Sequence, residues 1–240
     1  MKLTNLKLPG EGNYFMQEAM NVLRTNIQFC GRDVKVIAIT SCFANEGKSV
    51  ISLMIGKSLS ELGKKVLVID ADMRNSVMAG RNSDSRNVQG LSEVLTGLEA
   101  FDNIVYTTQY ENLDVLFSGQ YPPNPVELLN GQYFDQLLTE QKEHYDYIIV
   151  DTPPLGMVID AAVISAKCDS AIVIIGKKDV KYRMAQDVVE QLKKSGCKVL
   201  GVVLNNSNTK HKGYYYKGKY AYRHKYYAGH QTAENNDQQS

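Results

Sequence analysis

Five short, mostly apolar runs constrain the fold of this chain more than any other feature. The runs are Val34–Thr40, Val66–Asp70, Tyr147–Asp151, Ala171–Ile175 and Val199–Leu204. They do not alternate apolar with polar residues, as a strand with one solvated face does, so each is expected to be buried on both faces. Helical patterns separate them, most clearly at Met157–Ala166 and Lys181–Lys194, and an apolar helix is predicted from about Lys48 to Leu62. This order predicts an α/β fold: a doubly wound, mostly parallel sheet with helices on both faces and right-handed crossovers.

Length, cysteine content and hydropathy narrow the class of protein. A chain of 240 residues with 43% hydrophobic content can bury one full core. Its four cysteines are scattered and include no Cys-x-x-Cys pair, which argues against a zinc site. No apolar run approaches the roughly 18 residues that span a bilayer, and the first residues lack the apolar segment of a signal peptide. We therefore expect an intracellular protein that is soluble unless a partner holds it at a membrane.

The first predicted strand leads into a candidate phosphate-binding loop. From Ser41 to Ser49 the sequence reads SCFANEGKS, and a predicted helix begins at Lys48. Such a loop points backbone N–H groups at phosphate, and the helix N-terminus adds its dipole. The lysine then reaches the β- and γ-phosphates, and the hydroxyl ligates magnesium. Because Cys42 occupies the place of the usual first glycine, the segment alone fits either a P-loop or an ordinary helix N-terminus after a turn.

Two further predicted strands end in carboxylates. The sequence VLVIDADMR places Asp70 and Asp72 at a strand end, followed by Arg74. In an extended chain the two carboxylates point the same way, toward a shared cation or an acceptor hydroxyl. The sequence YIIVDTPP ends its strand in Asp151, where P-loop enzymes hold the magnesium shell. Each acid alone could be a helix cap or a common strand end, but the three motifs in this order predict a site for ATP and Mg²⁺.

A cluster of tyrosines follows the last predicted strand. Its members are Tyr214, Tyr215, Tyr216, Tyr220, Tyr222, Tyr226 and Tyr227. Between residues 210 and 230 there are six Lys or Arg and no acid, so the rest of the chain carries −5 against +1 for the whole. No period of 2 or 3.6 runs through the segment, which predicts a flexible tail. A phosphate-handling core with its own hydroxyl acceptors suggests a kinase that modifies itself; binding of anionic lipid or nucleic acid is the other reading.

These four motifs, in this order, resemble the bacterial tyrosine kinases that control capsular and exopolysaccharide synthesis. That family belongs to the MinD/ParA branch of P-loop proteins, and the chain is similar to its stand-alone cytoplasmic type. The resemblance covers residues 14–227 and includes the segments GLSEVLTG at 90–97 and PPNPVELL at 122–129. It implies a P-loop NTPase fold and protein-tyrosine kinase activity.

The chain departs from the family pattern at two places. Ala44 and Asn45 stand where the family loop usually has Pro or Gly, which bears on nucleotide affinity and loop geometry. The family's N-terminal helix often carries Glu-x-x-Arg-x-x-Arg, which helps to assemble a ring. Here Asn21 replaces the first arginine while Arg24 keeps the second, which bears on ring assembly more than on catalysis.

The resemblance implies three overlapping sets of site residues. The nucleotide would be held by Asn45, Glu46, Gly47, Lys48, Ser49, Val50 and Asn205. The magnesium shell would contain Ser49, Asp72 and Asp151. The catalytic residues would be Lys48, Asp70, Asp72 and Arg74. Asp70 would accept the proton of the tyrosine, whose phenol has a pKa of ~10, and Arg74 would orient a carboxylate or steady the transition-state charge. Asn205 would touch adenine, although a turn-forming role explains it equally well.

The resemblance also implies domains, partners and a location. Residues 1–30 would be a leader and helix that serve oligomerisation, 31–208 the kinase domain, and 209–240 a disordered tail. The kinase would autophosphorylate the tyrosine cluster between subunits and regulate polysaccharide synthesis and export. Its partners would be a transmembrane polysaccharide co-polymerase that activates it, further copies of itself and a cognate tyrosine phosphatase, with no nucleic acid. It would be cytoplasmic and reach the inner face of the membrane only through the activator.

The alternative function is a MinD/ParA-like ATPase switch, a nucleotide-gated binding module. That class usually carries an extra lysine near the start of the P-loop, and positions 41–46 contain none. It also leaves the seven tail tyrosines without a purpose. A degenerate pseudo-enzyme, weakened in the loop at Cys42 and Ala44, is a third reading. The sequence favours the kinase.

Overall fold

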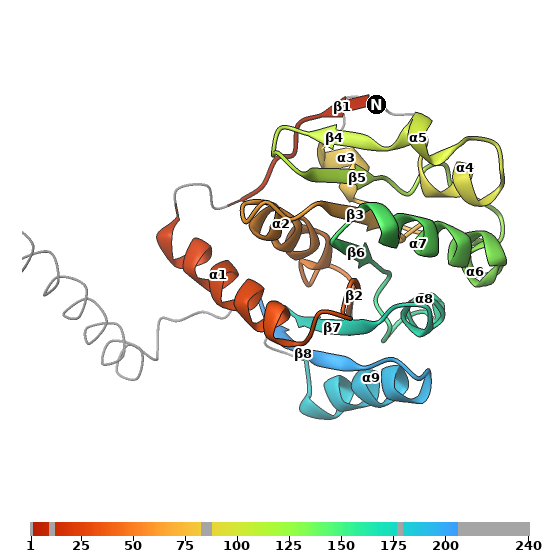
Figure 1. Cartoon of the computed structure of the whole chain (residues 1–240). Coiled ribbons are helices and arrows are strands. Elements are labelled where there is room, and N and C mark those ends of the chain that lie inside the picture. The colour runs from red at the N-terminus through yellow and green to blue at the C-terminus, as the bar shows by residue number, and fades with distance from the viewer. Residues whose placement is uncertain (1, 10–12, 83–87, 177–179, 206–240) are drawn as a thin grey trace, which may run out of the picture. The chain divides into compact units, whose positions relative to one another are not determined.

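A mostly parallel sheet organises the computed structural model, which describes residues 2–9, 13–82, 88–176 and 180–205. Within these ranges the sheet has eight strands in the order β1-β4-β5-β3-β6-β2-β7-β8, with β1 and β4 at the top edge of Figure 1 and β8 at the bottom. The strands are β1 (Lys2–Thr4), β2 (Val36–Ser41), β3 (Val66–Asp70), β4 (Tyr106–Thr108), β5 (Leu113–Leu116), β6 (Tyr147–Asp151), β7 (Ser170–Ile175) and β8 (Val199–Leu204). Neighbouring strands run parallel except β4 and β5. The predicted doubly wound α/β fold is confirmed.

Helices cover both faces of the sheet. They are α1 (Tyr14–Phe29), α2 (Lys48–Ser60), α3 (Met78–Asn82), α4 (Leu91–Leu95), α5 (Phe101–Ile104), α6 (Pro125–Asn130), α7 (Gln132–His144), α8 (Asp160–Ala166) and α9 (Tyr182–Lys194). Buried residues of α1, α2 and α3 join one hydrophobic cluster, and those of α4 to α9 join two others. The second group lies across the sheet from the first because the two groups take alternate residues of the same strands.

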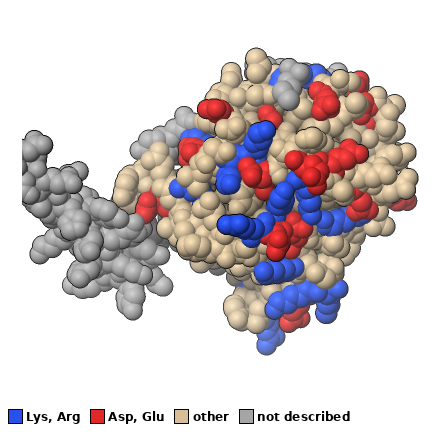
Figure 2. Space-filling view, in the orientation of Figure 1, with Lys and Arg blue, Asp and Glu red and all other residues tan. Residues whose placement is uncertain are grey.

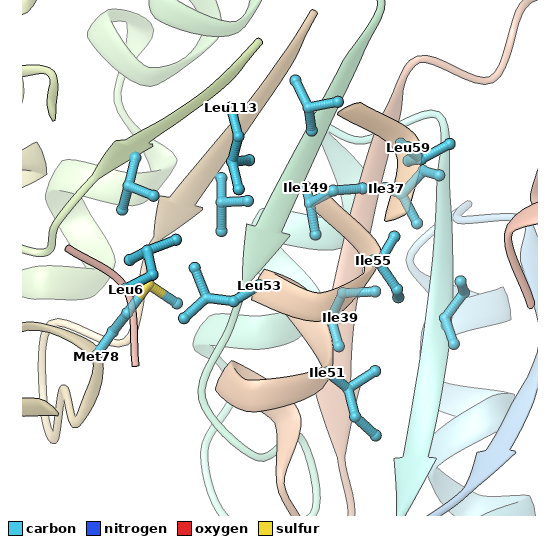
Figure 3. Packing of buried hydrophobic residues seen from close by; sticks show 14 of the residues in the cluster. Leu6, Ile37, Ile39, Ile51, Leu53, Ile55, Leu59, Met78, Leu113 and Ile149 are labelled. Carbon is cyan, nitrogen blue, oxygen red and sulfur yellow. The ribbon is translucent and has the colours of Figure 1, made fainter. Parts of the chain in front are cut away.

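Strand β2 illustrates this division of side chains. Ile37 and Ile39 belong to the α2 side, whereas Val36 and Ala38 belong to the opposite side. Figure 3 shows Ile37 and Ile39 beneath α2, whose apolar residues project toward the strands at helical spacing. All four β2 residues are fully buried. A strand covered on both faces must be apolar along its length, which explains the apolar runs at β2, β3, β6 and β7. The expectation of burial on both faces is wrong for β8, the edge strand, where Val202 and Leu204 are 47% and 67% exposed.

The structure extends the sheet beyond the five predicted strands. Strands β1, β4 and β5 come from segments that were not predicted as strands, and β1 lies in the expected leader. The helix predicted at 157–166 begins only at Asp160, because the prolines of Asp-Thr-Pro-Pro and the turn after them delay it. Helix α1 begins at Tyr14 because the Asn13 side chain accepts the N–H groups of Phe15 and Met16.

The described surface carries charges of both signs. On the face in Figure 2, Lys and Arg side chains are interleaved with Asp and Glu. Among the described residues, no helix has the length and hydropathy that crossing a bilayer requires. Contacts divide the chain after Asn205, and the predicted tail at 209–240 lies outside the described residues.

Candidate active site

The loop between β2 and α2 depends on two left-handed residues. Asn45 has φ 64°, and Gly47, which precedes the first residue of α2, has φ 88°. Asn is the side chain that tolerates this region best, so it can stand where the family uses glycine. Gly47 is required for space as well, since an added Cβ would lie 2.2 Å from Nδ2 of Asn205. Cys42, at the place of the first glycine, is buried, and burial raises the pKa of its thiol to about 11.

Glu46 braces this loop from inside the protein. Its fully buried carboxylate accepts the backbone N–H of Phe43 at 2.8 Å and that of Gly176, at the end of β7, at 3.1 Å. Its backbone carbonyl accepts the side-chain amide of Asn205, at the end of β8, at 2.9 Å. The loop is therefore tied to two neighbouring strand ends. The predicted nucleotide-binding residues Glu46, Gly47 and Asn205 are brought together.

A pocket of about 240 Å³ opens at the N-terminus of α2. Its lining includes Lys48, Ser49, Asp72 and Arg74, together with Asn45, Gly47 and Val50. Lys48 is buried despite its charge, with 7% of its surface exposed. A helix N-terminus with a buried lysine and a hydroxyl is the arrangement that receives nucleotide phosphates. Three of the four predicted catalytic residues line one cavity.

Asp151 ends β6, and its carboxylate lies near enough to Lys48, which lines this pocket, to feel its charge. It is fully buried, and its Oδ1 accepts the hydroxyl of Ser52 at 3.1 Å. Its Oδ2 is buried and has no hydrogen-bond partner among the residues that the structure describes. Burial raises the pKa of Asp151 to about 6, and the positive charge of Lys48 opposes that rise. An oxygen left in this state is suited to a cation.

The carboxylates of Asp70 and Asp72 lie in different surroundings. Asp72 lines the pocket, and burial raises its pKa against the backbone N–H of Asn75 and the charge of Lys48. Asp70 does not line that pocket: its carboxylate accepts the Ser76 hydroxyl and the backbone N–H of Asp72. Burial, followed by the nearby charge of Asp151, raises the pKa of Asp70 well above its usual range.

The oxygens at this site suit magnesium. Among the described residues no group of three or more His, Cys, Asp or Glu side chains could hold a metal on its own. Mg²⁺ rarely needs such a cage, because it keeps several waters and is shared with substrate phosphates. The Ser49 hydroxyl, Asp72 and the unpartnered oxygen of Asp151 would supply the few protein contacts that it uses.

Asp160 belongs to the site although it is in none of the predicted sets of site residues. Arg74 donates from Nε to Oδ2 of Asp160 at 2.7 Å, and this bond raises the pKa of Arg74. Asp160 begins α8, nine residues after Asp151, but it lies inside the helix predicted at 157–166, so no sequence signal singles it out. The predicted acceptors, Tyr214 to Tyr227, lie outside the described residues.

Comparison with known proteins identifies the family of this chain. A family model described as an AAA domain matches residues 34–206. The tyrosine-protein kinase CpsD of Streptococcus agalactiae is 42% identical over 192 residues, which are 80% of this chain and 84% of that protein.

Two solved structures show the same fold. The crystal structure of the chimerical protein CapA2B2 is 30% identical, covers 86% of this chain and 94% of its own, and superimposes with a TM-score of 0.77. The septum site-determining protein MinD of Pyrococcus horikoshii, complexed with Mg-ADP, is 25% identical over 74% of this chain and 72% of its own, with a TM-score of 0.61. The chain belongs to the bacterial P-loop protein-tyrosine kinases of capsule biosynthesis.

Proposed function

We propose that this kinase transfers the γ-phosphate of ATP to the tyrosines of its own C-terminal cluster, and that one subunit modifies another. The pocket at the N-terminus of α2 supports the nucleotide half of this proposal, because Lys48, Ser49 and Arg74 meet there. The related MinD structure contains Mg-ADP. The seven tyrosines of residues 214–227 support the acceptor half.

The residues of the site divide the chemistry between them. Backbone N–H groups from Asn45 to Val50 surround the phosphates, and Lys48 neutralises charge on the β- and γ-phosphates. Ser49, Asp72 and Asp151 would hold magnesium. The bound cation would screen the phosphate charge, and it would lower the pKa of the two aspartates, which burial raises. Asp70 accepts the proton of the attacking phenol. Its raised pKa makes its ionised form a stronger base than an ordinary aspartate.

Membership of the family supports a proposal for the cellular setting. We propose that a transmembrane polysaccharide co-polymerase activates the kinase and holds it at the inner face of the membrane. The phosphorylation state of the tail would then regulate polysaccharide synthesis and export, with a cognate tyrosine phosphatase resetting it. Each phosphotyrosine adds roughly −1.5 to −2 charges, so three or four would cancel the six basic residues of the tail.

Incubation of the full chain with ATP and Mg²⁺ tests the activity. Intact mass and peptide mapping should show phosphate on residues 214–227 of the wild type and none on Lys48→Met. Lys57→Met is the matched control, because Lys57 lies in the same helix and pairs with Glu61 at 3.7 Å. Steady ATP hydrolysis with an unmodified tail would instead assign the chain to the ATPase-switch class.

A mixing experiment tests transfer between subunits. The acceptor is the Lys48→Met chain, which keeps its tyrosines, and the donor is a chain whose seven tail tyrosines are phenylalanine. Phosphate on the acceptor tail requires transfer from the other chain. An unlabelled acceptor, with a wild type that labels itself, would mean that each subunit modifies only its own tail.

A further inference from the structure

The salt bridge between Arg74 and Asp160 joins the two strand-end loops of the site. Arg74 follows β3 and lines the phosphate pocket, with 37% of its side chain exposed. Asp160 follows β6 and begins α8, with 1% of its side chain exposed. The bond from Nε to Oδ2 is 2.7 Å long, which is short for an N–H···O contact. A partly exposed arginine is therefore attached to a buried carboxylate.

The way in which Arg74 is held leaves most of its donors for a ligand. A guanidinium is planar and carries five N–H donors, one on Nε and two on each terminal nitrogen. Among the described residues, Asp160 is the hydrogen-bond partner recorded for the Arg74 side chain, and it takes Nε. The two terminal NH₂ groups remain as donors, and the salt bridge sets the plane in which they lie. Planar pairs of donors match phosphate oxygens, which a lysine ammonium does not reproduce.

The carboxylate of Asp160 has fewer hydrogen-bond partners than a buried carboxylate with a purely structural role is expected to have. Its Oδ1 is buried and has no hydrogen-bond partner among the described residues. Asp169, just beyond the other end of α8, provides the contrast. It also binds a base at 2.7 Å, Lys142, but its second oxygen accepts the N–H groups of Lys35 and Val36. A buried carboxylate with one unsatisfied oxygen destabilises the fold relative to a satisfied one, so its service to Arg74 is the better explanation for its presence.

We infer that Asp160 is a positioning residue for phosphoryl transfer: it aims the guanidinium of Arg74 at the phosphoryl group as that group leaves ATP. This inference rests on the proposed function. In the step, the tyrosine oxygen forms a bond to the γ-phosphorus, the bond to the β–γ bridging oxygen breaks, and ADP leaves. The phenolic proton passes to the base, for which we proposed Asp70. Arg74 donates to the phosphoryl oxygens, and Asp160 touches neither substrate nor nucleotide.

A double-mutant cycle on the full chain tests this inference. Arg74→Ala should lower kcat by about 100-fold, as the loss of one transition-state donor does. Asp160→Asn should lower kcat by roughly 10-fold, because it removes the charge that holds the guanidinium but leaves the arginine. The double variant should be no slower than Arg74→Ala alone, since Asp160 acts through that residue. The KM for ATP should stay within about 3-fold in all three variants, because the ground-state contacts remain.

Asp169→Asn is the matched control. It removes an ion pair of the same length beyond the opposite end of the same helix, so it should lower the melting temperature and leave kcat unchanged. Arg74→Lys keeps the positive charge but removes the planar pairs of N–H donors. It should therefore lower kcat nearly as much as Arg74→Ala does.

Several outcomes would overturn the inference. Additive losses in the double variant would mean that Asp160 acts independently of Arg74. A higher kcat in Asp160→Asn would mean that the bridge holds Arg74 away from the phosphates. Equal losses in Asp160→Asn and Asp169→Asn would reduce Asp160 to a structural role. Rates are read both on the tail and on an added tyrosine peptide; a wild type that modifies only the peptide would refute the proposed tail acceptor while leaving the cycle measurable.

Discussion

Helices α1 and α2 lie side by side (Figure 1), yet they are built for different surroundings. Nine of the thirteen residues of α2 are buried, including Lys48 at its N-terminus. Ile27 alone among the sixteen described residues of α1 is buried, while Phe15 and Phe29 are 75% and 82% exposed. Contacts within this one chain bury most of α2, and they also form most of the nucleotide site. They leave apolar surface of α1, at Phe15 and Phe29, exposed to solvent.

Arg24 marks the boundary between these two regions. It is the second arginine position of the family's ring-assembly motif, and its Nη1 donates to the backbone oxygen of Ser58 in α2 at 2.9 Å. It also contacts the Ser58 hydroxyl at 3.3 Å. In this chain the residue therefore anchors α1 to α2. We predict that any assembly through α1, with Asn21 at the other position, depends more on apolar contact than on arginine.

Within α2 and its flanks, the largest effect apart from the loss of Lys48 concerns the glycines beyond the two ends of the helix. Gly47→Ala should lower kinase activity by about 100-fold or more, because the new Cβ would collide with Asn205 and displace the loop. Gly63 is also left-handed, with φ 72°, but nothing lies within 4 Å of its missing Cβ. Gly63→Ala should therefore lower stability by about 1 kcal/mol and leave activity intact. Phosphorylation rates with thermal melts separate the two; equal activity losses would mean that the P-loop is no more constrained than the far end of the helix.

The next effect is a pH dependence of nucleotide binding. The pKa of Asp151 is raised to about 6 from 3.8, so the folded protein holds a proton there that a bound cation must displace. Affinity for Mg-ADP should rise with pH between about 5 and 7, by at most 10-fold per pH unit for this proton, and then level off. Without ligand the sign is opposite: the contribution of Asp151 to stability falls as pH rises from about 4 to about 6.

Titration calorimetry with Mg-ADP at several pH values checks this prediction. Asp151→Asn should bind more weakly and lose much of the pH slope, whereas Asp135→Asn, which removes a half-exposed acid paired with Lys167, should keep it. Asp70 would contribute a slope of the same sign, since its pKa is also raised. A wild-type affinity that does not change between pH 5 and 7 would contradict the role of Asp151.

The contrast between features set by local sequence and features set by distant partners explains which of them could be predicted from the sequence. The bounds of β3, β6 and β8 were predicted correctly, because a strand apolar at every position begins and ends sharply. Strand β4 was missed because it has only three residues, Tyr-Thr-Thr, which form no apolar run. The acids at strand ends were visible in local motifs. The brace at Glu46 and the bridge to Asp160 were not, because each depends on a partner that only the fold brings near.

A smaller effect is expected at the brace of the P-loop. Glu46→Gln keeps the size of the side chain but replaces one acceptor with a donor, which would face the N–H of Phe43 or Gly176. One buried N–H is then left without its acceptor, at a cost of about 1–3 kcal/mol. Affinity for Mg-ADP should fall by roughly 10-fold while the chain stays folded. Glu61→Gln, at the exposed end of α2, is the control; unchanged affinity in Glu46→Gln would show that the loop holds its shape without the brace.

The smallest effect on the isolated chain should come from the exposed side of α1. Phe15→Ser and Phe29→Ser remove apolar surface that is already in water, so the free energy of unfolding should change by no more than about 0.5 kcal/mol. Ile27→Ala, on the buried side of the same helix, should lower it by about 2–5 kcal/mol. Light scattering on the two phenylalanine variants should then show a smaller mean mass than the wild type at equal concentration. If their mass matched the wild type, α1 would not be an assembly surface, and the difference between the two helices would reflect only their distance from the core.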